Sequence, residues 1–422
     1  MKTRTLADWL SYLEQLHPTS IDMGLERSRA VARRLGLGRP AKRVVTVTGT
    51  NGKGSTCALL AALLRAQGLR VGIYSSPHLL RYNERVTVDG VEASDADLCA
   101  AFAAVEAARG EISLTYFEMG TLAAFWLFER AALDFVVLEV GLGGRLDAVN
   151  LVDADLALIT SIAIDHVEWL GNSRDSVAIE KAGIFRAGKP ALCGDPAPPA
   201  AVQQQADALG APLILRGRDY QLTVQEQAWS WHGRNVAGEA LFLNDLPLLD
   251  LPMQNAALAL QAYALLDLPW EPVHLVAALV AAKVPGRMDR RRLNWRGKAL
   301  TLLLDVGHNP HAAGYLAERL QAVGGKRAAV FGLLADKDLS GVIEPLLGSI
   351  DRWAVAPLPT PRSRPAAELE AALRQRAAQV VAYDSIAAAL DAQCELAGEG
   401  DELLVFGSFY CVAEALEWLA RH

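Results

Sequence analysis

Short apolar runs rich in β-branched residues alternate with longer amphipathic stretches along the first part of the chain. Such runs are typical of strands buried on both faces of a parallel sheet, and the stretches between them repeat apolar residues at helical spacing. This alternation predicts an α/β domain. Strands are expected at residues 44–48, 71–74, 135–140 and 156–160, a hairpin at 86–91, an irregular segment at 18–27, and helices at 5–16, 55–67, 95–109, 116–132, 253–266 and 272–282.

Two further patterns divide the rest of the chain. Between residues 220 and 243, short alternating segments that contain Trp229 and Trp231 predict a small antiparallel sheet. Residues 283–287 interrupt the helical pattern, and the β/α alternation then restarts, which predicts a second, smaller, Rossmann-like α/β domain. We therefore expect one domain over residues 1–287 and another over 288–422. The strands of the second domain are expected at 300–304, 328–331, 353–356 and 403–406.

Composition and charge argue against several classes of protein. The net charge of −7 is unusual for a nucleic-acid-binding protein, which usually has a basic face. The longest apolar stretches, such as residues 122–128, are too short to span a bilayer. Asp8 and Glu14 lie where a secretory signal would be apolar. The five cysteines have no C-x-x-C spacing, so a disulfide framework or a zinc site is not expected. We expect a cytoplasmic protein that binds neither nucleic acid nor membrane.

The first expected strand ends in Gly49-Thr50-Asn51-Gly52-Lys53-Gly54-Ser55, and a helix follows. Small residues let backbone N–H groups surround a phosphate, and the helix N-terminus adds partial positive charge. Lys53 can reach the outer phosphates, and Ser55 or Thr56 can hold Mg²⁺. The motif differs from the usual P-loop because Gly54 separates the lysine from the hydroxyl residue. An ordinary glycine-rich turn is the alternative, but the order strand, loop, helix favours a nucleoside triphosphate site.

Polar residues follow other expected strands as well. Glu139 ends one strand and opens into a glycine-rich stretch, and a carboxylate near a triphosphate is a natural Mg²⁺ ligand. His166 follows the next strand and could bind a metal with support from Asp165. Ser76 could supply a hydroxyl ligand. Because ligands bind at the carboxyl ends of parallel strands, we expect these groups near one site. The alternatives are a solvent-facing glutamate, a structural histidine and a simple turn.

Three further positions have plain structural alternatives. Lys181 ends an expected helix, where a cation offsets the helix dipole, and the residues alone favour this interpretation. Asp305-Val306-Gly307-His308 follows the first strand of the second domain. Arg287 lies at the joint between the domains, where a cation could meet a phosphate. Helix capping and surface charge are the alternatives for the last two.

Taken together, these motifs resemble the bacterial bifunctional dihydrofolate synthase/folylpolyglutamate synthases, which belong to the Mur-ligase-like superfamily of ATP-dependent amide ligases. The resemblance covers nearly the whole chain, and the extra Gly54 is a habit of the family. It implies a P-loop, Mur-ligase-like ATPase domain with a pterin site at residues 1–287 and a glutamate ligase domain at 288–422. The matching segments are 21–27, 49–55, 74–79, 114–118, 138–147, 165–166, 180–185, 305–310 and 407–409.

The resemblance also implies a role for each motif. Lys53, His166 and Lys181 would be the catalytic residues. Lys181 would be carbamylated by CO₂, which turns a cation into a metal-binding carboxylate and replaces the helix-dipole interpretation. Two Mg²⁺ ions would be held by Ser76, Glu139, His166 and Lys181, and K⁺ is a further candidate cofactor. ATP would contact Thr50, Asn51, Gly52, Lys53, Gly54, Ser55, Asn255, Arg287, Asp305 and His308.

The substrate expected from the resemblance is dihydropteroate. Residues 21–25 are the feature associated with dihydrofolate synthase activity. The pterin site would be formed by Ile21, Asp22, Met23, Thr115, Tyr116, Phe117, Glu118, Leu146, Asp147 and Ala148.

The implied reaction is amide formation. ATP would phosphorylate a carboxylate of dihydropteroate or of a tetrahydrofolate, and the amine of L-glutamate would attack the acyl phosphate. The expected partners are therefore small molecules, and we expect a monomer. The sequence leaves open how many glutamates are added, which folate form is preferred and which residues bind the incoming glutamate.

Three other functions compete with this one. A peptidoglycan Mur ligase would carry a UDP-binding domain before the phosphate loop. Only about forty residues precede that loop here, which is too few for such a domain. A folate enzyme without dihydropteroate activity is disfavoured by residues 21–25. A P-loop ATPase that acts as a switch or motor would hydrolyse ATP without glutamate, and it would leave Asp165-His166 and the second domain without a role.

Overall fold

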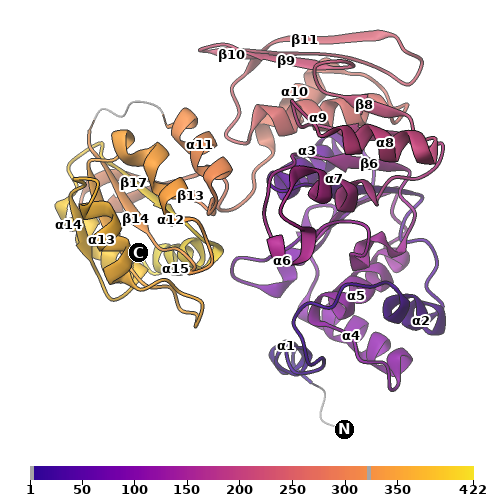
Figure 1. The fold of residues 1–422 in the computed structure, drawn as a ribbon, viewed down its shortest axis with the longest axis horizontal. Helices are drawn as coiled ribbons and strands as arrows, with labels where there is room; N and C mark the ends of the chain where they lie inside the picture. The colour runs from indigo at the N-terminus through magenta and orange to yellow at the C-terminus, as the bar shows by residue number, and fades with distance from the viewer. Residues whose placement is uncertain (1–3, 321–324) are drawn as a thin grey trace. The chain divides into compact units, whose positions relative to one another are not determined.

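The computed structural model describes residues 4–320 and 325–422. The chain divides after Ala282 into two compact units, a few residues before the boundary expected from the sequence (Figure 1). Each unit has its own sheet flanked by helices, and the first also carries a small antiparallel sheet. The predicted fold class is confirmed. Within the described residues, no helix has the length and apolar character needed to cross a membrane.

The first unit is built on an eight-stranded sheet in the order β4-β3-β2-β5-β1-β6-β7-β8. The strands from β2 to β8 in this order run parallel, and β3 and β4 add an antiparallel edge. Every residue of β5 is buried, as expected for a strand covered on both faces. The bounds are β1 (Arg43–Thr48), β2 (Val71–Tyr74), β3 (Val86–Val88), β4 (Val91–Glu92), β5 (Phe135–Glu139), β6 (Leu156–Ile159), β7 (Ala191–Cys193) and β8 (Leu213–Leu215).

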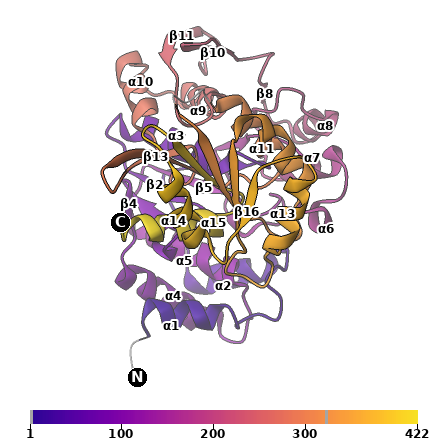
Figure 2. The ribbon, with the colours of Figure 1, turned by 90° about the vertical axis from the view of Figure 1, so that its left-hand side faces the viewer.

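Helices cover both faces of this sheet (Figure 1). On one face, α3 (Lys53–Arg65) packs against α9 (Met253–Ala264) and α10 (Pro272–Ala281). The other face carries a single apolar core, and Figure 2 shows two of its helices, α1 and α4, side by side. The helices that contribute to this core are α1 (Leu6–Leu13), α2 (Glu26–Leu35), α4 (Asp95–Arg109), α5 (Tyr116–Ala131), α7 (Arg174–Ala182) and α8 (Ala200–Leu209).

Helix α2 corrects the expectation of an irregular segment up to Arg27. The helix begins at Glu26, and Leu25 at its N-cap makes no side-chain capping bond. Only Ser28 and Val31 are buried in this helix, so its apolar face is narrow. The two signals that predict a helix from sequence, a capping side chain and a wide apolar face, are therefore both weak here.

The small sheet of the first unit is antiparallel, as the sequence predicts. Trp229 and Trp231 are buried on the central strand and alternate with more exposed residues, and α9 packs against this sheet. The strand order is β11-β10-β9, with bounds β9 (Gln221–Val224), β10 (Ala228–Arg234) and β11 (Ala240–Pro247).

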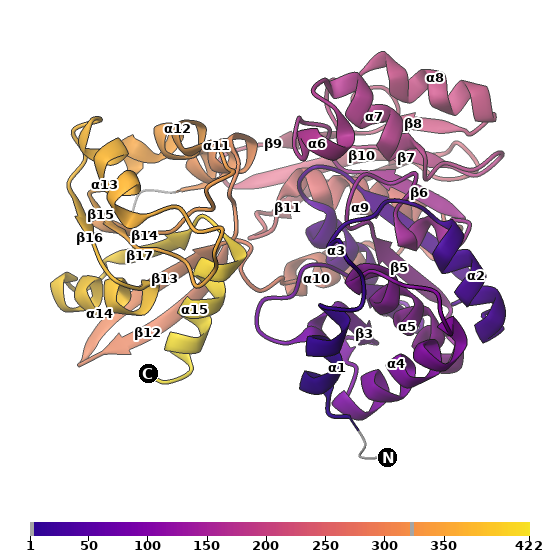
Figure 3. The same cartoon turned by 60° about the horizontal axis from the view of Figure 1, so that its bottom comes forward.

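The second unit contains a six-stranded sheet in the order β12-β13-β17-β14-β15-β16. All neighbours are parallel except β12, which pairs antiparallel with β13 and contains most of the basic run 287–292. Helices lie on both faces (Figure 3). The strands are β12 (Asp289–Trp295), β13 (Lys298–Asp305), β14 (Arg327–Phe331), β15 (Arg352–Val355), β16 (Val380–Ala382) and β17 (Glu402–Phe406), and the helices are α11 (Pro310–Arg319), α12 (Leu339–Ile343), α13 (Ala366–Arg374), α14 (Ile386–Leu396) and α15 (Phe409–Leu419).

Strand register brings several loops of the first unit to one edge. Val47 of β1 pairs with Glu139 of β5, and Tyr74 of β2 pairs with the adjacent Leu138. On its other side, β1 pairs with β6 up to the strand end. Because these strands are parallel, the loops after β1, β2, β5 and β6 start side by side, where ligands of such sheets bind.

Candidate active site

The phosphate loop (residues 49–55) is fixed by hydrogen bonds to the loop that follows β6. The Thr50 N–H donates to the Ser161 carbonyl at 2.9 Å. The Thr50 hydroxyl donates to the Ala163 carbonyl at 3.0 Å and accepts from the Ala163 N–H at 2.9 Å. The Thr160 hydroxyl donates to the Asn51 carbonyl at 2.6 Å. Backbone and hydroxyl groups therefore hold the loop in shape.

Two features prepare the start of α3 for an anion. Gly52 caps the helix at φ 86°, and a Cβ there would lie 2.7 Å from the side-chain amide of Asn255. Only glycine permits both the left-handed turn and this approach. The Lys53 ammonium donates to the carbonyls of Gly49 at 3.0 Å and Thr50 at 3.3 Å, so it lies over the loop. A helix N-terminus beside an ammonium suits a polyphosphate.

Glu139 joins this loop to the segment after β2. It is almost fully buried, and its Oε2 accepts the Ser76 N–H at 3.1 Å. A Cβ on Gly54 would lie 3.5 Å from the same oxygen. Ser76, Glu139 and the phosphate loop are thus brought together. Oxygen donors beside a phosphate site suit a hard divalent cation.

Lys181 is buried at the end of α7, with 3% of its surface exposed. Burial, aided by repulsion from Lys53, lowers the pKa of Lys181 to about 7. A lysine that only offset the helix dipole would keep its ammonium in water. One cavity is lined by the four predicted site residues Thr50, Lys53, His166 and Lys181, together with residues of the loop after β5.

His166 begins the short helix α6 (Val167–Leu170) and has a left-handed backbone, with φ 50°. Its N–H donates to the Asp165 Oδ1 at 2.9 Å. Asp165 therefore shapes the backbone turn that places His166 in the cavity. Non-glycine residues in this conformation are uncommon and cluster at functional sites.

The glycine loop (residues 140–147) receives side chains from two segments predicted to bind dihydropteroate. The Phe117 ring packs on Gly141, where a Cβ would lie 2.7 Å from its Cζ. The Met23 Cε would lie 3.4 Å from a Cβ on Gly143. On the far side, a Cβ on Gly144 would lie 2.8 Å from the Glu180 carbonyl, so this glycine lets α7 approach.

Several of the other predicted substrate residues have structural contacts of their own. Asp147 closes the glycine loop by accepting the N–H groups of Leu142 at 2.9 Å and Val149 at 3.0 Å, and burial raises its pKa to about 6. Thr115 and Glu118 form the capping box of α5. Ala148 is buried, Tyr116 and Leu146 are half-buried, and Ile21 is exposed.

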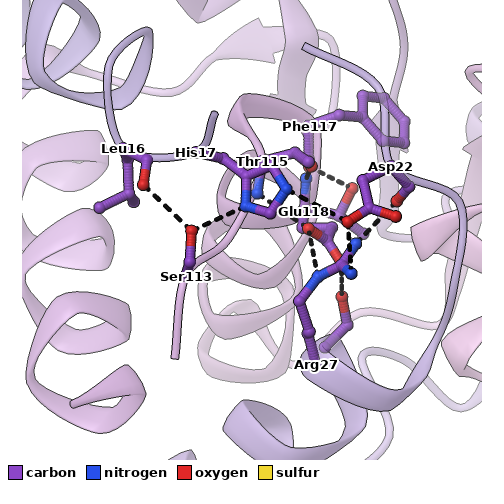
Figure 4. A network of polar contacts seen from close by, with 10 residues as sticks. Leu16, His17, Asp22, Arg27, Ser113, Thr115, Phe117 and Glu118 are labelled. Atoms are coloured by element: carbon purple, nitrogen blue, oxygen red, sulfur yellow. Dashed lines mark hydrogen bonds and ion pairs between the residues drawn. The ribbon is translucent and has the colours of Figure 1, made fainter. Parts of the chain in front are cut away.

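A polar network that the sequence did not reveal joins residues 16–25 to the start of α5 (Figure 4). His17 Nε2 lies 3.2 Å from Asp22 Oδ2, and the Arg27 guanidinium bridges Asp22 and Glu118. Ser113 and Glu118 lie more than 90 residues from their partners in this segment, so no local pattern in the sequence could have found these contacts. We call residues 16–25 the tethered segment.

The second unit gathers its own predicted residues at the end of β13. Asp305 accepts the N–H groups of Met288 at 2.9 Å and Gly307 at 2.7 Å. Burial raises the pKa of Asp305, and the positive charge of Arg287 opposes that rise. The Arg287 Cζ lies 5.5 Å from the centre of the Phe409 ring, and the centre of the His308 ring lies 6.3 Å from it. Arg287, Asp305 and His308 therefore lie together within this unit, and Asn255 lies at the phosphate loop of the first.

Over residues 4–320 and 325–422, no three His, Cys, Asp or Glu side chains gather as a metal-binding group. A divalent ion at the phosphate loop would need ligands of other kinds as well. Besides the Glu139 carboxylate, the Ser76 hydroxyl and phosphate oxygens could supply such donors.

Family models match both units. Residues 47–193 match the Mur ligase middle domain, and residues 286–409 match the Mur ligase, glutamate ligase domain. A dihydrofolate synthase/folylpolyglutamate synthase of Escherichia coli (strain K12) is 46% identical over 414 residues, which are 98% of this chain and 95% of the relative. One from Haemophilus influenzae is 43% identical over 430 residues, 98% of this chain and 97% of the relative.

Solved structures agree with these sequence matches. Escherichia coli FolC in complex with DHPP and ADP has a TM-score of 0.92 and 46% identity, covering 99% of this chain and 98% of the other. The Yersinia pestis bifunctional enzyme complexed with AMPPNP and Mn ion has a TM-score of 0.91, 46% identity and the same coverage. The resemblance indicated by the motifs is confirmed: the chain belongs to the dihydrofolate synthase/folylpolyglutamate synthase family of Mur ligases.

Proposed function

We propose that the chain is an ATP-dependent amide ligase that joins L-glutamate to dihydropteroate and to tetrahydrofolates through an acyl phosphate. The observation that carries this proposal is the phosphate loop, where Lys53 and Lys181 line one cavity and the buried Glu139 lies against Gly54. The relatives named dihydrofolate synthase/folylpolyglutamate synthase match the chain over almost its whole length and support the substrate class.

Activation of a carboxylate is the difficult part of the reaction. A carboxylate is a poor electrophile, and phosphorylation supplies its leaving group. The N–H groups at the start of α3 would orient the triphosphate, and Lys53 would offset the charge that moves during phosphoryl transfer. The glutamate amine then displaces phosphate through a tetrahedral intermediate. The residues proposed to contact ATP are Thr50, Asn51, Gly52, Lys53, Gly54, Ser55 and Asn255 from the first unit and Arg287, Asp305 and His308 from the second.

We assign a CO₂-derived carbamate to Lys181. Carbamate formation consumes a neutral amine, and a pKa of about 7 leaves about half of the side chain neutral at neutral pH, whereas an ordinary lysine is almost wholly charged. The carbamate would add an oxygen donor to Ser76, Glu139 and His166 as ligands of two Mg²⁺ ions. Bound there, the ions would polarise phosphate oxygens and offset their charge.

Dihydropteroate is proposed to bind along the glycine loop. Met23 and Phe117, which both reach this loop, supply apolar surface for a flat ring. Asp22 supplies a carboxylate for N–H donors. The remaining members of the set are Ile21, Thr115, Tyr116, Glu118, Leu146, Asp147 and Ala148.

The proposal extends to the organisation of the protein. Residues 1–287 would form the ATP-binding domain with the pterin site, and residues 288–422 the glutamate ligase domain. The family match over 286–409 supports a boundary near this point, and the compact units divide a few residues earlier, after Ala282. A cytoplasmic location is supported by cysteines that are all unpaired in the structure. A monomeric state and K⁺ as an additional cation complete the proposal.

An ADP-release assay with ATP and Mg²⁺ tests this function. Dihydropteroate and tetrahydrofolate are compared, each with and without L-glutamate. We expect ADP only when an acid substrate and glutamate are both present. ADP release that needs neither would identify an ATPase switch or motor and would reject the ligase.

A further inference from the structure

The tethered segment crosses from α1 to α2 without regular secondary structure, and side chains fix it at both ends. His17 Nδ1 lies 2.7 Å from the Ser113 hydroxyl, which in turn donates to the Leu16 carbonyl at 3.1 Å. The other ring nitrogen of His17 lies 3.2 Å from Asp22 Oδ2. His17 therefore links the segment before α5 to Asp22 (Figure 4).

Arg27 completes the attachment from the first turn of α2. Its Nη1 donates to Asp22 Oδ2 and its Nη2 to the Asp22 carbonyl, both at 2.7 Å. The same guanidinium pairs with Glu118 at 3.2 Å. Glu118 has only 4% of its side chain exposed and also accepts from the Ser28 hydroxyl and the Thr115 N–H. Arg27 thus binds the backbone and the side chain of Asp22 to a fixed, buried carboxylate.

The two oxygens of the Asp22 carboxylate have different surroundings. Within the described part of the chain, the bonds from His17 and Arg27 both use Oδ2, and none uses Oδ1. The side chain is 40% exposed, whereas His17 is 11% exposed. One oxygen is held by the protein, and the other remains for a donor from solvent or from a ligand.

We propose that His17 and Arg27 are positioning residues that hold Asp22 so that its Oδ1 accepts an N–H group of the dihydropteroate ring. This inference rests on the proposed function. Neither residue touches substrate, and both act through Asp22. The fixed geometry lowers the entropy lost when the ring binds, so the network contributes to substrate affinity and leaves the phosphoryl transfer unchanged.

The test compares Arg27→Gln and His17→Gln with Arg29→Gln. Arg29 lies two residues along the same helix, is exposed, and makes no side-chain hydrogen bond or ion pair within the described residues. We expect KM for dihydropteroate to rise about tenfold in Arg27→Gln and less in His17→Gln, because Arg27 makes the charged hydrogen bonds. The kcat and the KM for ATP stay within about twofold, and Arg29→Gln behaves as the parent protein.

A double variant separates positioning from general damage. If Arg27 acts through Asp22, adding Arg27→Gln to Asp22→Asn changes KM for dihydropteroate by less than about twofold. Full additivity of the two effects would overturn the proposal, as would an unchanged KM in both Arg27→Gln and His17→Gln. Equal changes in kcat and in the KM values of all substrates would also overturn it, since they indicate a structural role only.

Hydrogen exchange provides a readout that does not depend on activity. Amides of residues 19–25 should exchange faster in Arg27→Gln than in Arg29→Gln, with the remaining amides unchanged. Equal exchange in the two variants would contradict the tether. If the parent protein does not turn over dihydropteroate, the proposed function fails, and this comparison still decides whether Arg27 holds the segment.

Discussion

The phosphate loop and the tethered segment belong to the same unit, and different interactions hold them. Hydroxyl and backbone bonds to residues 160–163 fix the phosphate loop, and Gly52 supplies a turn that other residues resist. Charged side chains hold the tethered segment, through Arg27 and the buried Glu118. The first arrangement suits a rigid catalytic part, and the second suits a part that determines how well one substrate binds.

The difference should divide the effects of substitutions into two classes. Changes at the phosphate loop remove transition-state interactions and lower kcat. Changes at the tether alter ground-state binding of one substrate and raise its KM. The predictions below test this division, starting with the largest effect.

Replacing Lys53 with alanine removes the ammonium that lies over the phosphate loop. We expect glutamate-dependent ADP release to fall by about 1,000-fold or more, as for other groups that stabilise transferring phosphoryl charge. Lys42→Ala is the matched control, because the Lys42 side chain is 76% exposed and its ammonium pairs with Asp134 at the surface. Turnover near the parent value in Lys53→Ala would reject the phosphate-loop assignment.

Lys181→Ala removes the group proposed to carry the carbamate. We expect activity to fall by about 100-fold or more and to recover in part when short carboxylic acids are added, since they restore an oxygen ligand. Lys181→Arg keeps a cation but cannot form the carbamate, so it should be equally inactive. Full activity of either variant without additives would remove the carbamate from the mechanism.

Gly52→Ala and Gly36→Ala form a matched pair of variants, because one glycine faces a side chain and the other faces open space. Both residues have positive φ, 86° and 67°, so alanine strains each backbone by about 1–2 kcal/mol. Only at Gly52 would the methyl group meet a side chain, the amide of Asn255. We expect KM for ATP to rise about tenfold in Gly52→Ala alone. Equal KM values in the two variants would show that Asn255 and Gly52 do not form one nucleotide site.

The depressed pKa of Lys181 predicts how its modification depends on pH. The neutral amine is the minor form below pH 7 and the major form above it. At a fixed concentration of dissolved CO₂, apo-protein freed of carbamate at low pH should regain activity roughly tenfold faster at pH 8 than at pH 6, from the neutral fractions at a pKa of about 7. Reactivation rates that do not change over this range would indicate that Lys181 titrates elsewhere.

Local patterns in the sequence predicted the phosphate loop, Glu139 and most strands of the two main sheets, because each is specified within about ten consecutive residues. Strand β12 was missed, since it coincides with the basic run 287–292 and is not an apolar stretch. Strands β7, β8 and β16 have three residues each and carry too little pattern to be found. Contacts between residues far apart in the sequence could not be predicted for a different reason. His17 and Ser113 are 96 residues apart, and Arg27 and Glu118 are 91 apart, so their pairing depends on the folded structure alone.

The central claim is that the phosphate loop directs ATP to activate a carboxylate of the substrate. It can be tested most directly with dihydropteroate labelled with ¹⁸O in both carboxylate oxygens, by mass analysis of the phosphate released. Formation of an acyl phosphate transfers one labelled oxygen to inorganic phosphate in each turnover, and only when L-glutamate is present. Release of unlabelled phosphate alongside amide product would contradict the account.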